Sequence, residues 1–345
     1  MAARGRPTLR EVAERAGVSA RTVSNVVNSG VPVRPETRAR VEQVIAELGY
    51  RPNLAARRLR SGRSHTVGLA LPGLTVPYFR EFTDSMLAAA HRHGMSLLVA
   101  QTGGDADRER SVARDPYFRH VDGIVLAAVS LGHDDVPALS GPVPVLVAAT
   151  SFRPAGVDTV DTDAAGAARA VVEHLYDGGR RAIAAVVPGD AGRPTEQDER
   201  YRGYVAALHA AGLTVDPRRV VGAGAVTPSS GARAVRTLLD RAPETDAVFA
   251  LGDALGLGVL RGLRDAGRTV PDDVAVVGFG DVPESAHSNP TLSSVDPGQQ
   301  EIAGRSVALI AGGLAGPPGA AGRAVLRETV GFRLVVRESS RAPGA

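Results

Sequence analysis

Apolar residues recur at helical spacing in three short stretches near the start of the chain. The pattern Thr8-Leu-Arg-Glu11 is a capping box, which predicts that a first helix begins there, and Gly17 favours its end. Ser19 stands at the N-cap of a second stretch, 20–27, and a third helix is expected over 35–48. Two short helices joined by a glycine-containing turn are typical of a helix-turn-helix. The pattern therefore predicts a small three-helix domain.

From residue 66 onward, short apolar runs alternate with longer helical patterns, which predicts buried parallel strands connected by helices. Strands are expected at 67–71, 96–100, 123–126, 143–147, 182–187, 220–221, 247–251 and 274–278, with a last one near 334–336. Helices are expected at 164–176, 200–211, 230–241 and 254–266. The fold class that follows is α/β, with an N-terminal helix-turn-helix head and a two-lobed body of two doubly wound parallel sheets.

The composition narrows the class of protein. The chain has 345 residues, which is too long for one small module. No run approaches the roughly 20 apolar residues of a membrane span, so a soluble protein without a membrane partner is expected. The absence of cysteine excludes disulfides and thiolate chemistry. The first ten residues lack the apolar core of a secretory signal, which favours a cytoplasmic location.

The formal net charge of +3 conceals an asymmetry between the two ends of the chain. Residues 1–64 contain 13 arginines and five acidic residues, a net charge of +8, whereas the remainder carries −5. A basic head on an acidic body is the electrostatic pattern expected of a protein that binds a polyanion such as DNA. Basic runs also occur on solvated faces, so charge alone leaves the function open.

The outward face of the second predicted helix carries short or hydrogen-bonding side chains. Such residues can approach base edges and phosphates closely, and Arg21 can fork onto guanine while Asn25 reaches a base edge. Any three-helix bundle shows a similar apolar pattern, so this face is the feature that favours DNA. Its residues are Ser19, Ala20, Arg21, Thr22, Ser24, Asn25 and Asn28.

The run TLREVAERAGVSARTVSNVVN and the later run ETRARVEQVIAELGYRPNLAARRLRSGRS resemble the lactose-repressor (LacI/GalR) family of bacterial transcription regulators. The resemblance implies a repressor that binds double-stranded operator DNA as a homodimer and responds to a small-molecule effector. It places base-reading positions at Ala20, Arg21 and Asn25. It places phosphate-contacting positions at Thr8, Ser19, Thr22, Ser24, Asn28 and Thr37.

The family uses the segment after the head as a hinge helix that forms on DNA and inserts a leucine into the minor groove. The matching segment here is 54–60, with Asn53 as its cap. Leu59 is the residue expected to enter the groove, with Ala56 beside it. Tyr50 precedes this segment and is counted among the DNA-binding residues. An ordinary basic linker is the alternative.

The resemblance extends over nearly the whole chain, because the family's core is similar to periplasmic sugar-binding proteins. The expected domains are a DNA-binding head at 1–50, a hinge and linker at 51–65, and an effector-binding and dimerisation body at 66–345. Within the body, the first lobe is expected at about 66–160 and 292–325, and the second at about 161–290 and 326–345. The crossings between lobes are expected near Asp161, Pro290 and Arg327.

Ligands of doubly wound sheets bind beyond the carboxyl ends of the strands, so an effector cleft is expected between the lobes. Sugar-binding relatives carry polar side chains that hold the sugar at four positions. In this chain those positions are occupied by Ala149, Asp198, Gly252 and Gly280. Each charge-assisted hydrogen bond lost costs roughly 1–3 kcal/mol. We therefore expect an effector other than an ordinary free sugar, unless shifted loops supply substitutes. The other residues expected to face the cleft are Tyr78, Phe79, Arg193, Arg200, Asp253, Phe279 and Asp281.

Three alternatives stand beside this interpretation. The run Gly256-Leu-Gly258-Val-Leu-Arg-Gly262 is faintly similar to a dinucleotide-binding loop. Its glycines fall inside a helical pattern, so no cofactor site is expected. His91 and His93 would point apart on a helix, so no metal site is expected, and no catalytic arrangement of side chains indicates an enzyme. A solute-binding receptor fits the body but conflicts with the basic head. The third alternative is a regulator of the same fold that acts without a ligand.

Overall fold

The structure, a computed structural model, describes residues 7–28, 32–50, 63–150, 154–189, 198–314 and 324–341. The chain divides into two compact units, Met1–Ser64 and His65–Ala345, which are described separately as the head and the body. Within the described ranges, no helix has both the length and the apolar character needed to cross a membrane.

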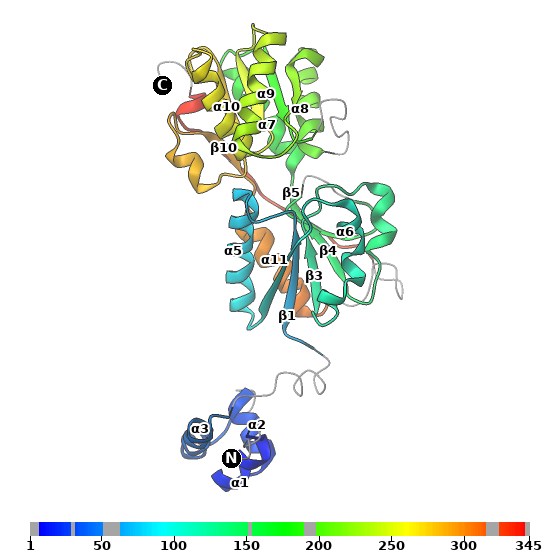
Figure 1. Ribbon diagram of the computed structural model, residues 1–345, viewed down its shortest axis with the longest axis vertical. Coiled ribbons are helices and arrows are strands. Elements are labelled where there is room, and N and C mark those ends of the chain that lie inside the picture. The colour runs from blue at the N-terminus through cyan, green and yellow to red at the C-terminus, as the bar shows by residue number, and fades with distance from the viewer. Residues whose placement is uncertain are drawn as a thin grey trace, which may run out of the picture. The chain divides into compact units, whose positions relative to one another are not determined.

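The head contains the helices α1 (Leu9–Ala16), α2 (Ala20–Asn28) and α3 (Pro35–Leu48), drawn in blue in Figure 1. The predicted capping box is present, because the Glu11 amide donates to Thr8 Oγ1 at 3.3 Å and the Thr8 amide donates to Glu11 Oε2 at 2.7 Å. Gly17 follows α1 in the left-handed conformation, with φ of 64°. The helices enclose a small apolar core of Val12, Ala13, Ala16, Val23, Val26, Val41, Val44 and Tyr50.

The first lobe of the body is built on a parallel sheet with the strand order β11-β5-β4-β3-β1-β2. Its strands are β1 (Thr66–Leu71), β2 (Ser96–Gln101), β3 (Gly123–Leu126), β4 (Val145–Ala148), β5 (Asp158–Thr162) and β11 (Arg327–Val330). One face is covered by two long helices that pack against each other, α5 (Pro77–Arg92) and α11 (Gln299–Gly312) (Figure 1). The other face is covered by short helices, α6 (Ala106–Ser111), η1 (Val112–Arg114), η2 (Pro116–Phe118) and η3 (His133–Leu139).

The second lobe has a sheet with the order β12-β10-β9-β8-β6-β7, parallel except for β12, which runs antiparallel to β10. Its strands are β6 (Ile183–Val187), β7 (Val220–Gly222), β8 (Ala247–Ala250), β9 (Ala275–Phe279), β10 (Ser293–Asp296) and β12 (Arg333–Val335). One face is covered by α7 (Ala164–Asp177) and α8 (Glu199–Ala210), and the other by α9 (Pro228–Arg241) and α10 (Asp253–Asp265). Short helices η4 (Pro217–Arg219), η5 (Pro283–His287) and η7 (Glu338–Ser340) complete it. The predicted α/β class with two doubly wound sheets is confirmed.

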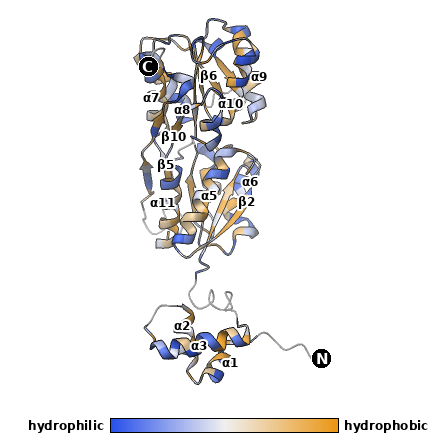
Figure 2. Ribbon diagram, turned by 90° about the vertical axis from the view of Figure 1, so that its left-hand side faces the viewer, coloured by the Kyte–Doolittle hydropathy of each residue, from blue (hydrophilic) through white to orange (hydrophobic). Residues whose placement is uncertain are grey.

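The hydropathy of the body explains this layering. In Figure 2 many strands of the body are hydrophobic, whereas its helices carry both hydrophobic and hydrophilic residues. Strands buried on both faces read as continuous apolar runs, so β1, β3, β6, β8 and β9 were identifiable in the sequence.

Two of the three crossings between lobes were predicted too early. β10 pairs with β9, so residues 293–296 belong to the second lobe, although 292–325 was assigned to the first. β11 pairs with β5, so residues 327–330 belong to the first lobe, although 326–345 was assigned to the second. Both strands are short and polar, with sequences SSVD and RETV, and lack the apolar run that marks a buried strand. The first crossing follows β5, close to the predicted position at Asp161.

Candidate DNA-binding surface and effector cleft

The N-terminal turn of α2 is capped and faces solvent. The Thr22 amide donates to Ser19 Oγ at 3.1 Å, and the two hydroxyl oxygens lie 2.9 Å apart. Ala20 and Arg21 are exposed, and Asn25 is half-buried. The three predicted base-reading residues are therefore accessible on one short helix, which a helix-turn-helix places in the major groove.

The arginines of the head differ in whether an acidic partner neutralises them. Within the part of the head that the structure describes, Arg21 makes no ion pair, so its guanidinium is available to a guanine or a phosphate. Other arginines are paired with glutamates on the head itself. These pairs are Arg10–Glu14 at 3.1 Å, Arg15–Glu47 at 3.8 Å and Arg38–Glu42 at 3.6 Å.

Some residues predicted to bind DNA do not lie on the exposed surface of α2. Ser24 is only 9% exposed, so its prediction on the outward face is wrong, because this side of α2 packs against the other helices. Tyr50 is 8% exposed and belongs to the head's core. Thr8 is exposed, but its hydroxyl already caps α1, and Thr37 is half-buried. Outside the described residues lie Asn53, Ala56, Leu59, the predicted hinge helix and the side chain of Asn28.

A cavity of about 540 Å³ opens between the two lobes of the body. The loops after β1, β2, β3 and β4 of the first sheet contribute to its wall, and so do those after β6, β7, β8 and β9 of the second. The cavity therefore lies at the carboxyl ends of the strands, where doubly wound folds bind ligands. Its volume lies within the range of small-molecule sites.

The cavity brings together most of the residues predicted for the effector. Gly280 and Asp281 are exceptions, and Arg193 lies outside the described residues. Asp281 was predicted to face the cleft, but its carboxylate lies 2.7 Å from the guanidinium of Arg337, which holds it away. The predicted residues that do line the cavity are Tyr78, Phe79, Ala149, Asp198, Arg200, Gly252, Asp253 and Phe279.

Arg200 contributes a guanidinium group to the wall of this cavity, and neighbouring residues of the protein hold that group in place. Its Nε and Nη2 donate to the two carboxylate oxygens of Asp198 at 3.0 and 2.7 Å, and its Nη1 donates to the Leu251 carbonyl at 2.7 Å. The guanidinium carbon lies 5.4 Å from the centre of the Phe279 ring. Burial alone would lower the pKa of Arg200, but the Asp198 carboxylate raises it, so the group stays charged.

Asp253 is the first residue of α10, and its carboxylate is bound by neighbouring groups of the protein. Its Oδ2 accepts hydrogen bonds from the Val282 amide and the Ser285 hydroxyl, both at 2.9 Å, and its Oδ1 accepts from Ser294 Oγ at 2.6 Å. Burial raises the pKa of Asp253 to about 6, although these three donors oppose that shift. The carboxylate therefore ties α10 to β10 and to the loop that precedes it.

Several polar residues of the cavity were not predicted. Asp161, in β5, is 3% exposed, and its carboxylate accepts the amides of Thr150 at 3.0 Å and Thr162 at 2.9 Å. Ser130 follows β3 and also lines the wall. The sequence DTVDT carries no apolar run, so β5 and its inward carboxylate went unrecognised. The signal available was position, since Asp161 is the next-to-last residue of β5 and stands at a predicted crossing.

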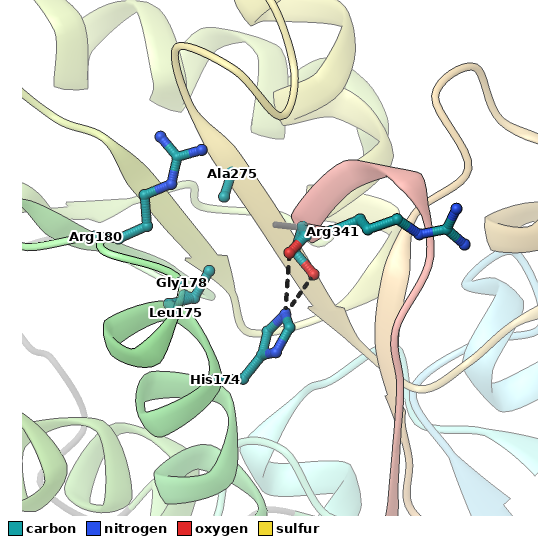
Figure 3. Close-up of a pocket in the computed structure, with 7 residues that line it drawn as sticks. His174, Leu175, Gly178, Arg180, Ala275 and Arg341 are labelled. Carbon is teal, nitrogen blue, oxygen red and sulfur yellow. Dashed lines mark hydrogen bonds between the residues drawn. The ribbon is translucent and has the colours of Figure 1, made fainter. Parts of the chain in front are cut away.

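A second, small cavity lies within the second lobe, and none of its lining residues lines the interlobe cavity. Its volume is about 10 Å³, room for about one water, and it lies beside His174 on α7 (Figure 3). The His174 ring nitrogen Nε2 lies 2.8 Å from Ser340 Oγ and 3.1 Å from the Ser340 carbonyl oxygen. Ser340 Oγ also donates to Ser293 Oγ at 2.8 Å. These contacts attach the C-terminal η7 to the second lobe and leave no room for a substrate.

Comparison with known proteins identifies the two units. Residues 8–53 match the family of bacterial regulatory proteins, lacI family, and residues 172–340 match a periplasmic binding protein-like domain. HTH-type transcriptional regulator CelR of Thermobifida fusca is 38% identical over 327 residues, covering 90% of this chain and 92% of that protein. Catabolite control protein A of Priestia megaterium is 33% identical over 289 residues, covering 84% and 86%.

Solved structures show the same architecture. The transcriptional regulator CelR-cellobiose complex is 34% identical, with a TM-score of 0.66, and the match covers 97% of this chain and all of that chain. The lac repressor dimer bound to operator and the anti-inducer ONPF has a TM-score of 0.80 at 24% identity, covering 98% and 100%. The second likeness is one of fold.

A helix-turn-helix head joined to a two-lobed, periplasmic-binding-protein-like body defines a DNA-binding transcriptional regulator. The relatives that match the chain over most of its length are regulators and not enzymes, so the enzyme alternative is set aside. The chain belongs to the LacI family of bacterial regulatory proteins. The glycines that are similar to a dinucleotide loop lie inside α10, as expected.

Proposed function

We propose that this regulator is a repressor that binds an inverted-repeat operator as a homodimer and is modulated by a small molecule in the interlobe cleft. Arg21 and Asn25 would read bases, while Ser19 and Thr22 would contact phosphates. The observation that carries the proposal is the capped, exposed first turn of α2, with Arg21 unpaired within the described head. The protein would act where the DNA is, in the cytoplasm at the nucleoid.

The dimer follows from the small reach of one head. A single helix-turn-helix contacts only a few base pairs, and two linked heads on an inverted repeat gain effective concentration. The lac repressor structure named above is a dimer on its operator, which supports this arrangement. When a ligand binds, the lobes would close or reorient and so change the affinity for the operator. The ligand cleft and the DNA-binding head would then be linked by a coupling free energy.

Selection of bound sequences from random double-stranded DNA tests the proposal. We expect the full chain to enrich an inverted repeat whose half-sites are related by a twofold axis. Recovery of no shared sequence after several rounds would contradict sequence-specific binding. Recovery of a single unrepeated half-site would contradict the dimer and leave base reading in place.

A further inference from the structure

The polar side chains that line the interlobe cavity are mostly engaged by the protein. The hydroxyl of Ser130 donates to the Gly104 carbonyl at 2.5 Å, and that of Thr150 donates to the Ala128 carbonyl at 2.5 Å. Asp161 accepts two backbone amides, as described above. The pair Asp198–Arg200 and the carboxylate of Asp253 also have partners within the protein.

A free sugar is recognised through many donors and acceptors that remain unmet until it binds. A hydroxyl whose hydrogen is already donated gains little as a donor to a ligand, because the new hydrogen bond must replace the existing one. The hydroxyl hydrogens of Ser130 and Thr150 are used, so neither side chain donates to a ligand without losing its present bond. These two hydroxyls therefore contribute little as donors to a polyhydroxylated molecule.

Tyr78 differs from these groups. Its hydroxyl makes no hydrogen bond to any residue that the structure describes, although the side chain lines the cavity. Burial raises the pKa of Tyr78, and the nearby Asp161 carboxylate raises it further, so the phenol stays protonated and can donate. This donor lies in the first turn of α5, at the boundary between the lobes.

Gly280 makes room for Tyr78. Its φ is 130°, a conformation that side chains rarely adopt, and a Cβ there would lie 3.1 Å from Tyr78 Cδ2. The aromatic ring from the first lobe thus packs on bare backbone of the second.

The rest of the wall is apolar. Tyr78 and Phe79 pack edge to face, with ring centres 5.3 Å apart, and Phe279 adds a third ring from the second lobe. Aliphatic side chains of both lobes also line the cavity. These residues are Val76, Val129, Leu131, Val226, Leu251 and Val282. Such a surface gains affinity by burying an apolar body.

We propose that the cleft binds an uncharged ligand with a largely apolar ring system, and that the Tyr78 hydroxyl donates the hydrogen bond that orients it. The inference rests on the proposed function, because it assigns the class of effector to the same cleft. It contrasts with the cellobiose of the CelR complex, which is an uncharged but polyhydroxylated ligand.

Calorimetric titration of the full chain tests the proposal with four probes. Coumarin and 2-quinolone are uncharged, planar and carry one carbonyl acceptor, cellobiose is polyhydroxylated, and benzoate is an aromatic anion. We expect at least one of the two planar probes to bind at least tenfold more tightly than cellobiose and benzoate. Tyr78→Phe should weaken that binding about five- to tenfold, the loss of one hydrogen bond.

Tyr117→Phe is the matched control, because Tyr117 is 54% exposed and lies outside the cavity wall, so it should bind the planar probe as the wild type does. Cellobiose binding as tight as that of coumarin, failure of both planar probes to bind, or equal affinities of Tyr78→Phe and wild type would overturn the proposal. Operator binding by the wild-type chain is measured in parallel. Intact operator binding with any of these outcomes refutes the ligand class alone, whereas loss of operator specificity refutes the proposed function.

Discussion

Side chains on α2 divide into those that hold the head together and those that face outward. Val23 and Val26 are buried in the three-helix core, whereas Ala20 and Arg21 are exposed on the same helix. Arg21 has no acidic partner in the described head, so its charge is free for an external acceptor. A forked contact to guanine O6 and N7 is the role that this position and chemistry favour.

Replacing Arg21 with alanine should relax the preference at one operator base pair by about 1–3 kcal/mol and leave the rest of the site unchanged. The measurement is competition binding against operators with single base substitutions. Arg10→Ala is the matched control, because Arg10 is exposed on α1 and paired with Glu14, so it should retain the preference at every base. A uniform loss of affinity on operator and scrambled DNA would show that Arg21 contacts only phosphate.

Asp253 makes the stability of the body depend on pH. Because its pKa rises from 3.8 to about 6 on folding, the folded state binds the proton more tightly than the unfolded chain does. Its stabilising contribution is present below pH 4 and is lost as pH rises through about 6, by up to about 3 kcal/mol. Urea unfolding of the body between pH 4 and pH 7 should show this fall in wild type.

Asp253→Asn cannot titrate, so the fall should be missing from its profile, whatever its absolute stability. Asp84→Asn, on an exposed part of α5, leaves the Asp253 contribution in place and serves as the control. A profile for Asp253→Asn that parallels the wild type would show that this carboxylate does not control the dependence.

Helices α9 and α10 lie close together because glycines stand between them. A Cβ on Gly258 would overlap the Pro228 carbonyl oxygen, and one on Gly231 would overlap the Leu255 carbonyl oxygen. The same run of glycines is faintly similar to a cofactor loop in the sequence. Its use here is close packing of two helices, which needs no exposed amides.

Gly258→Ala should therefore lower the free energy of unfolding of the second lobe by about 1–3 kcal/mol, the usual cost of overpacking. The control is Gly312→Ala, at the end of α11, where a Cβ meets nothing within 4 Å. Alanine there should be neutral or slightly stabilising, because glycine is a poor helix former. Chemical denaturation of both variants measures the difference, and equal midpoints would contradict the packing argument.

The elements that the sequence predicted well are those with strong periodic patterns. Helices capped by threonine or serine and strands such as β6 and β8 were recognisable, because burial on both faces demands apolar residues. β5, β10 and β11 were missed, since residues such as Asp158 and Ser293 are buried there through hydrogen bonds instead. The local pattern of apolar and polar residues does not show which polar side chains form hydrogen bonds with residues distant in the sequence.

The same limit applies to the cleft. Tyr78, Arg200 and Phe279 were predicted from their places after strands, and they line the cavity. The sequence did not reveal that Asp281, unlike these residues, is held away from the cavity. Its partner Arg337 is distant in sequence and is brought near only by the second sheet. Which polar groups are already satisfied depends on contacts of this kind, and that property distinguishes an apolar cleft from a sugar site.

At the scale of the whole molecule, the chain combines a basic head of +8 with a body of −5. The head supplies sequence reading and phosphate attraction, while the body supplies a cleft between two lobes. The central claim is that these units form a sequence-specific DNA-binding regulator. Electrostatic attraction alone would produce salt-sensitive binding without preference for a sequence.

Binding of the full chain to the selected operator and to a scrambled duplex of equal composition, over a range of salt concentrations, tests this claim most directly. We predict that the operator binds at least about 1,000-fold more tightly at physiological salt and that both affinities fall steeply as salt rises. Equal affinities for the two duplexes at every salt concentration would contradict the account.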